Sequence, residues 1–142
     1  MRGKVGSLAL AAATLVSGCS TMEVKPTHVV GLWGGPHVGA QFQGGLADVQ
    51  FDCASGTIDD PVPVADVGPF SVKGTYRTGA PGPIKVGQFF KSQDAVFSGQ
   101  ITKGTAKNAP RTMTLNVVLE DGTALGPFML TENAPPQLTR CL

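Results

Sequence analysis

The sequence predicts an all-β protein: a small antiparallel up-and-down β-barrel of about seven or eight strands that follows a signal peptide. Three observations favour this class. The chain holds 19 Gly and 11 Pro among 142 residues, so turn formers are abundant and long helices have little room. Apolar and polar residues alternate over several runs, which is the period of a half-buried strand. Turn signals separate those runs at intervals typical of sandwiches and barrels.

The first eighteen residues have the pattern of a secretory signal peptide. A basic start with Arg2 and Lys4 leads into an apolar run over residues 5–16, and Ser17 and Gly18 are small. The run is shorter than the roughly 20 residues that a helix needs to cross a bilayer, which disfavours a retained transmembrane anchor. We therefore expect residues 1–18 to be removed.

The end of this segment, Leu15-Val16-Ser17-Gly18-Cys19, resembles the bacterial lipoprotein signal: an apolar residue, two small residues and Cys. The resemblance implies that Cys19 carries diacylglycerol through a thioether, becomes the first residue after cleavage and is acylated on its new amino group. Several acyl chains on one residue exceed the two signals that stable anchoring needs. By the same resemblance, Ser20 implies export to the outer membrane. The alternative is an ordinary secretory signal that ends in a Cys by chance.

The remaining chain is predicted to be a lipid-anchored tether, residues 19–32, followed by one β-barrel domain, residues 33–142. Pro26 and the lack of sustained periodicity indicate the tether. Removal of 18 residues from 142 leaves 124, a length that suits one domain with a core of its own. Charges are scattered rather than gathered into a basic stripe, so no nucleic-acid partner is expected.

Two hairpins have the clearest patterns. Alternating runs at 38–42 and 47–53 are joined by Gly44-Gly45, and runs at 113–119 and 124–130 are joined by Asp121-Gly122. Gly74 inside a predicted strand indicates a bulge or a close backbone contact. The other expected features are a short edge strand near 57–58, strands at 70–77 and 95–102, an apolar stretch at 84–90 whose partner the pattern does not identify, an exposed loop at 104–110 and a final strand at 137–142.

Two cysteines remain after Cys19, and they lie far apart at Cys53 and Cys141. Export places both in an oxidising compartment, where an even pair predicts a disulfide. Free thiols, or a catalytic thiol, would need an activating neighbour that the sequence does not identify. A bond between them would connect the last strand to an early one, so we favour a closed barrel over a sandwich.

Four segments resemble motifs of small uncharacterised bacterial exported domains. They are Trp33-Gly34-Gly35-Pro36-His37, Phe51-Asp52-Cys53-Ala54-Ser55-Gly56-Thr57-Ile58, Gly74-Thr75-Tyr76 and Arg140-Cys141-Leu142. The resemblance covers most of the chain after Cys19, departs at the longer hairpin of residues 104–110 and implies no activity. In addition, Gly31-Leu32-Trp33 is similar to the Gly-x-Trp start of the calycin barrels, which include lipocalins, avidins and small periplasmic protease inhibitors.

Residues for catalysis are scarce, so we do not expect an enzyme. The chain has two histidines, of which His28 lies in the tether, and no Gly-x-Ser-x-Gly, His-Glu-x-x-His or phosphate-binding Gly loop. One domain histidine and two paired cysteines are too few ligands for zinc, so no metal or cofactor is expected. Trp33 and His37 are the candidates for ligand binding. Alternatively, Trp33 plugs one end of the core and His37 bonds to backbone at a strand start.

The sequence thus favours a bacterial membrane-anchored lipoprotein that presents a small disulfide-closed β domain in a structural or protein-interaction role. Its expected location is the cell envelope, most readily the outer membrane, and its expected partners are the membrane and an envelope protein. One alternative is a calycin-like carrier of a small apolar ligand. Another is a periplasmic protease inhibitor that inserts its N-terminal segment or a loop into an active site.

Overall fold

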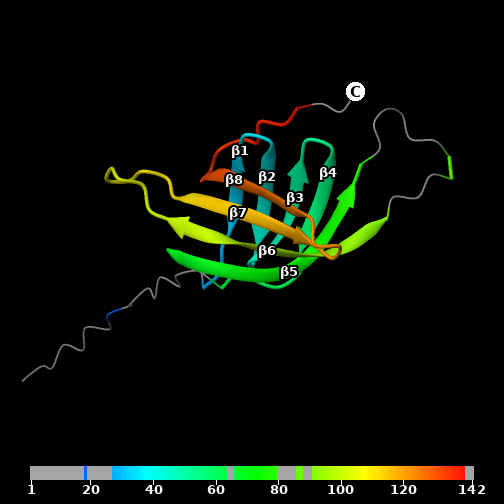
Figure 1. Ribbon diagram of the computed structural model, residues 1–142. Helices are drawn as coiled ribbons and strands as arrows, with labels where there is room; N and C mark the ends of the chain where they lie inside the picture. The colour runs from blue at the N-terminus through cyan, green and yellow to red at the C-terminus, as the bar shows by residue number, and fades with distance from the viewer. Residues whose placement is uncertain (1–17, 19–26, 64–65, 80–85, 88–90, 140–142) are drawn as a thin grey trace, which may run out of the picture.

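The computed structural model confirms the predicted fold class. It describes residues 18, 27–63, 66–79, 86–87 and 91–139. These residues form eight antiparallel strands and no helix, and the strands close into a barrel in which each strand pairs with its neighbours in sequence (Figure 1). The strands are β1 (Gly31–Gly35), β2 (Val38–Gln43), β3 (Leu46–Phe51), β4 (Ala54–Ile58), β5 (Gly68–Thr78), β6 (Ser92–Thr102), β7 (Thr112–Leu119) and β8 (Ala124–Glu132).

The two hairpins with the clearest sequence patterns are both present. Strands β2 and β3 pair from Val38↔Phe51 to Gln43↔Leu46, on either side of Gly44 and Gly45. Both turn glycines have positive φ, 60° and 84°, which is the left-handed region that glycine adopts without strain. Strands β7 and β8 pair across the turn that contains Gly122.

Strand β4 differs from its prediction as a short edge strand near residues 57–58. It spans Ala54–Ile58 and pairs with β3 on one side and with β5 on the other, so it is an interior strand of the barrel. The alternation over Gly56 and Ile58, both buried, continues back to Ala54, but Gly and Ser weaken the strand signal there. Of the apolar stretch at 84–90, the described residues 86–87 form a turn, and the rest lies outside the described residues.

The prediction of a final strand at residues 137–142 is wrong for the part that is described. Residues 137–139 are not a strand, and a single parallel bridge joins Gln137 to Pro36. The physical reason lies just before them, because Pro135 and Pro136 have no N–H to donate to a ladder. The barrel closes instead through β1 and β8, with Trp33 opposite Glu132 and Gly34 opposite Thr131.

The C-terminal segment, residues 133–139, lies against β1 and β2 and runs in the direction of β1. Asn133 N–H donates to the Leu32 carbonyl at 2.7 Å, and Gln137 N–H donates to the Gly35 carbonyl at 3.0 Å. Glycines at the paired positions 34 and 39 make room for it, since a Cβ on Gly39 would lie 2.4 Å from the Cβ of Pro136. The segment is therefore a strap across two strands rather than a ninth strand.

Alternation along the strands places one side of each strand in a single hydrophobic core. Among the described residues no polar or charged side chain is buried. Val29 is fully buried as well, so the folded part extends a few residues before Trp33. The largest fully buried side chains are Trp33, Phe97, Ile58, Ile101, Met113, Leu115 and Leu130.

Gly74 has the close contact that its position in a strand predicted. A Cβ on Gly74 would lie 2.0 Å from the Thr57 carbonyl oxygen and 2.8 Å from Cε2 of Phe97. A Cβ on Gly56, on the neighbouring strand β4, would lie 3.2 Å from Cζ of Phe97. The Phe97 ring thus packs directly on the backbone of β4 and β5, and this contact needs glycine at both positions.

We therefore expect Gly74→Ala to lower the free energy of unfolding by about 1–3 kcal/mol, as overpacking does in a tightly packed core. Urea denaturation followed by Trp33 fluorescence measures it. Ser71→Ala, on the exposed outer side of the same strand, is the matched control and should change stability by less than about 0.5 kcal/mol. Equal effects of the two substitutions would contradict the packing described here.

Candidate functional site

The barrel has two distinct ends. The tether end, where the chain enters β1, holds the turn at Gly44-Gly45, the described residues 59–63 and 66–67 between β4 and β5, and the loop 103–111. The far end holds the β1–β2 turn with His37, the β3–β4 turn with Asp52 and Cys53, and the β7–β8 turn. In Figure 1 the blue start of β1 and the red C-terminal segment reach opposite ends of the barrel.

Trp33 lies inside the barrel near the tether end and is 0% exposed. Its indole Nε1 donates a hydrogen bond to the Val30 carbonyl at 3.1 Å. The guanidinium carbon of Arg111 lies 5.4 Å from the centre of its ring, which is a cation–π distance. Trp33 is thus covered by protein on the side where a ligand would have to enter from this end.

Arg111 and Glu132 form a two-pronged ion pair over this end. Arg111 Nη2 donates to Glu132 Oε1 at 2.8 Å, and Arg111 Nε donates to Oε2 at 3.0 Å. Arg111 Nη1 also donates to the Asp66 carbonyl at 3.0 Å. The hydrogen bonds from Arg111 hold the pKa of Glu132 below its ordinary value, and the same bonds raise the pKa of Arg111. Both side chains are mostly buried, with 18% and 25% exposure.

The far end holds a close contact between the side chains of His37 and Asp52. His37 has φ of 67°, and its Nδ1 lies 2.6 Å from Asp52 Oδ2. The other carboxylate oxygen accepts the Thr139 N–H at 2.7 Å. That backbone hydrogen bond, followed by the contact with His37, holds the pKa of Asp52 below its ordinary value. Asp52 therefore fixes the C-terminal segment to the barrel.

These contacts place His37 beside the carboxylate that binds the C-terminal segment. The neighbouring cysteine, Cys53, is disulfide-bonded and so is not a thiolate nucleophile. No group of three or more His, Cys, Asp or Glu side chains is placed for a metal within the described residues. The two candidates for ligand binding are also not brought together, because Trp33 is inside the barrel whereas the His37 side chain is 62% exposed.

The predicted disulfide and lipidation sites fall mostly outside the described residues. The partner of Cys53 is not described, and neither is Cys141 or Cys19. The pairing of Cys53 with Cys141 and the acylation of Cys19 therefore stay predictions.

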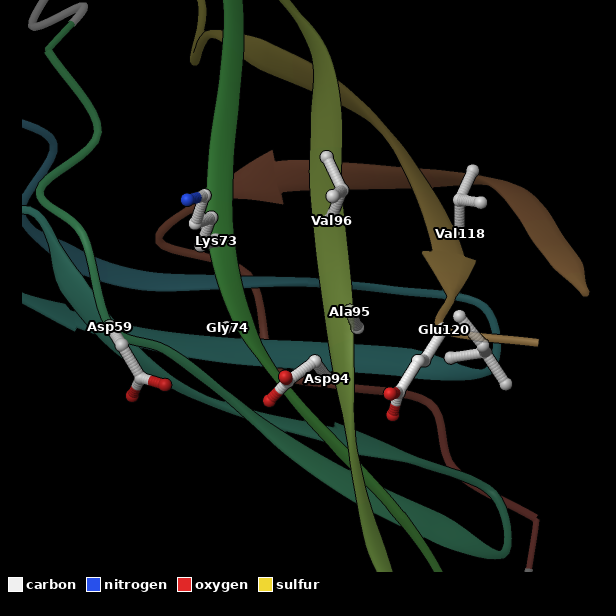
Figure 2. Close-up of a pocket in the computed structure, with 9 residues that line it drawn as sticks. Asp59, Lys73, Gly74, Asp94, Ala95, Val96, Val118 and Glu120 are labelled. Carbon is white, nitrogen blue, oxygen red and sulfur yellow. The ribbon is translucent and has the colours of Figure 1, made fainter. Parts of the chain in front are cut away.

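An open groove on the outer face of β5, β6 and β7 has a volume of about 400 Å³ (Figure 2). Val96 and Val118 lie opposite each other on β6 and β7 and are 41% and 42% exposed. In Figure 2, Lys73 and the two valines lie along one side of the groove. The carboxylates of Asp59, Asp94 and Glu120 line the other side.

The groove has an excess of negative charge, with three carboxylates against one ammonium group. In the part of the chain that the structure describes, no ion pair joins Lys73, Asp94 or Glu120 to another side chain. The backbone holds these positions in place, since Glu120 N–H donates to the Asp94 carbonyl at 2.9 Å and Asp59 N–H to the Lys73 carbonyl at 3.0 Å. An extended segment with an apolar side chain and a neighbouring Lys or Arg would complement both sides.

Comparison with known proteins found no family model, no curated protein and no solved structure that matches this chain. Across the described residues there is no helix long and apolar enough to span a membrane.

The Arg111–Glu132 pair gives a pH-dependent prediction for Glu132→Gln. Because the pKa of Glu132 is lowered from 4.5, its contribution is fully present above that pH and is lost as the pH falls through the lowered value. At pH 7 we expect the variant to lose about 1.5–3 kcal/mol of unfolding free energy, and the difference should shrink below pH 4. Urea denaturation at several pH values measures this, with Glu120→Gln as the exposed control. A pH-independent difference would be inconsistent with the ion pair.

Proposed function

We propose that this chain is a membrane-anchored lipoprotein of the bacterial envelope, most readily of the outer membrane. In this proposal Cys19 carries the lipid, and the barrel acts through its outer surface in a structural or protein-interaction role. No catalytic step, metal or cofactor is part of the proposal.

The observation that carries the proposed interaction role is the filled interior of the barrel. An eight-stranded barrel has an interior just wide enough for side chains or for one small ligand. Here Trp33, Phe97, Met113 and Leu115 are each at most 1% exposed and belong to one continuous core. The described pockets are lined by residues of the outer strand faces and rims. These features favour an interaction module over a carrier of an apolar ligand.

The start of the barrel also disfavours a protease inhibitor that inserts its N-terminal segment. The Val29 carbonyl accepts the Gly45 N–H at 3.0 Å, and the Val29 side chain is fully buried. Residues from Val29 onward are therefore committed to the barrel. An inhibitory segment would have to come from the residues between Cys19 and His28, which acylation would hold at the membrane.

A Cys53–Cys141 disulfide is part of the proposal, and the far end supports it. Thr139 N–H bonds to the carboxylate of Asp52, the residue directly before Cys53. Cys141 follows Thr139 by two residues, so two residues of chain, at most about 7 Å, separate their Cα atoms. Because Cα atoms of disulfide-bonded cysteines lie roughly 4.4–6.8 Å apart, Cys141 is within reach of Cys53.

Native mass spectrometry of protein gently extracted from membranes tests the proposal as a whole. We expect the mass of an acylated Cys19, two hydrogens fewer than the reduced chain and no small molecule bound. One bound small molecule per chain would instead favour the alternative function, a calycin-like carrier of a small apolar ligand. An unacylated N-terminus would remove the anchor on which the proposal depends.

For the interaction role, we propose the groove of Figure 2 as the contact surface, with a partner segment that carries an apolar side chain beside a cation. A photo-crosslinking residue at Val96 in living cells should yield a cross-linked product that identifies the partner. The double change Asp94→Lys and Glu120→Lys should lower the yield at least tenfold, because it reverses the charge of the groove. The same residue at Gln50, on the outer face of β3, is the control. Similar yields at both positions would argue against the groove.

A further inference from the structure

Several exposed aliphatic side chains gather at the tether end of the barrel. Val30 and Leu32 lie at the start of β1, Leu46 begins β3, and Val67 precedes β5. Their exposed fractions are 43%, 36%, 43% and 47%. Each is a large apolar side chain that the barrel leaves exposed to water.

Hydrogen bonds connect the segments that carry these side chains. Gly45, the neighbour of Leu46, donates its N–H to the Val29 carbonyl at 3.0 Å. Trp33 Nε1 donates to the Val30 carbonyl, and the Arg111 that covers the Trp33 ring donates to the Asp66 carbonyl, next to Val67. The segments that carry all four residues therefore lie around the point at which the chain enters the barrel.

The length of chain before this point determines how far it can lie from an anchored Cys19. Seven residues, 20–26, separate Cys19 from Thr27. Seven residues can span at most about 25 Å. A short tether of this kind keeps the tether end, and not the far end, next to the membrane surface.

The geometry points to the tether end as a lipid-contacting surface: Val30, Leu32, Leu46 and Val67 rest on the membrane that holds Cys19. This inference rests on the proposed lipid anchor. The transfer of aliphatic side chains from water to the boundary between headgroups and acyl chains is favourable, because it removes apolar surface from water. The anchor supplies a high local concentration, so a weak contact suffices.

The charges at this end are consistent with a contact that depends on the anchor. Asp66 lies 3.4 Å from Lys103 Nζ, which offsets its charge, whereas Asp60 is exposed and has no cation paired with it among the described residues. The exposed Lys107 at this end is outnumbered by the exposed Asp59 and Asp60, so the described residues carry no basic excess that would attract anionic lipids. An unacylated chain should not bind vesicles through this surface by itself.

The contact also orients the domain. With the tether end on the membrane, His37, Asp52 and the β7–β8 turn face away from it. The groove of Figure 2 then lies on the side wall of the barrel, with Glu120 toward the far end. An envelope partner could therefore reach the groove without displacing the membrane contact.

Nitroxide accessibility tests the inference on the acylated full-length mature protein in vesicles of phosphatidylethanolamine and phosphatidylglycerol. Labels are placed at Leu46→Cys and Val67→Cys, and at Val118→Cys as a control of similar exposure, 42%, near the far end of β7. Oxygen concentrates in the bilayer and a water-soluble nickel complex is excluded from it. We expect the ratio of oxygen to nickel collision rates to be at least threefold higher at Leu46 and Val67 than at Val118.

Each outcome of this experiment is distinguishable. Equal ratios at the three positions, with the acyl chains confirmed by mass, would overturn the membrane contact and leave the anchor intact. Low accessibility to both oxygen and nickel at Leu46 would also overturn it, because it would indicate contact with a second copy of the chain. A mass without acyl chains would overturn both the contact and the proposed function. Val30→Asp combined with Leu46→Asp should return the ratio at Val67 to that of Val118.

Discussion

The closure between β1 and β8 is the constraint on which the rest of the structure depends. Only two residue pairs join these strands, Trp33↔Glu132 and Gly34↔Thr131, whereas β5 and β6 pair over ten positions. So short a seam needs side chains to hold it. Arg111 makes such side-chain contacts: two of its nitrogens donate to the carboxylate of Glu132, and its guanidinium lies over the ring of Trp33. One cation thus ties together β1, β7 and β8 at the tether end.

Closure has two consequences for function. It joins the first and last strands of the sheet, but β8 pairs with β1 only through its last two residues, so the free edge of the sheet is shortened rather than removed. It also encloses an interior in which every buried side chain of the described residues is apolar. The surfaces that we propose for recognition are on the outside: the charged groove across β5–β7, and the apolar side chains around the start of β1.

Much of the fold could be predicted from the sequence, because alternation and turn residues are local signals. Gly44-Gly45 and Asp121-Gly122 mark hairpins within a few residues of their strands, and both hairpins formed. Arg111 could not be found in this way. It lies 21 residues from Glu132 and far from Trp33 in sequence, and nothing in its neighbours distinguishes it from a solvated strand residue.

The C-terminal segment shows that alternation of apolar and polar residues does not by itself predict a strand. Residues 137–142 have strand-like spacing, but two prolines before them prevent a ladder, and the described part is a strap held by single hydrogen bonds. The groove was also beyond sequence reasoning. The convergence of Asp59, Asp94 and Glu120 depends on how the long strands β5 and β6 cross the barrel.

The most direct test of the central claim, that this barrel acts through its outside because its inside is full, uses Trp33. It is the single tryptophan of the chain, and it lies in the core. Titration with a brominated fatty acid below its micelle concentration would quench Trp33 if an acyl chain entered the barrel. A filled interior predicts a blue-shifted emission that is insensitive to the acid. Saturable quenching at one acid per chain would contradict it and would identify a carrier instead.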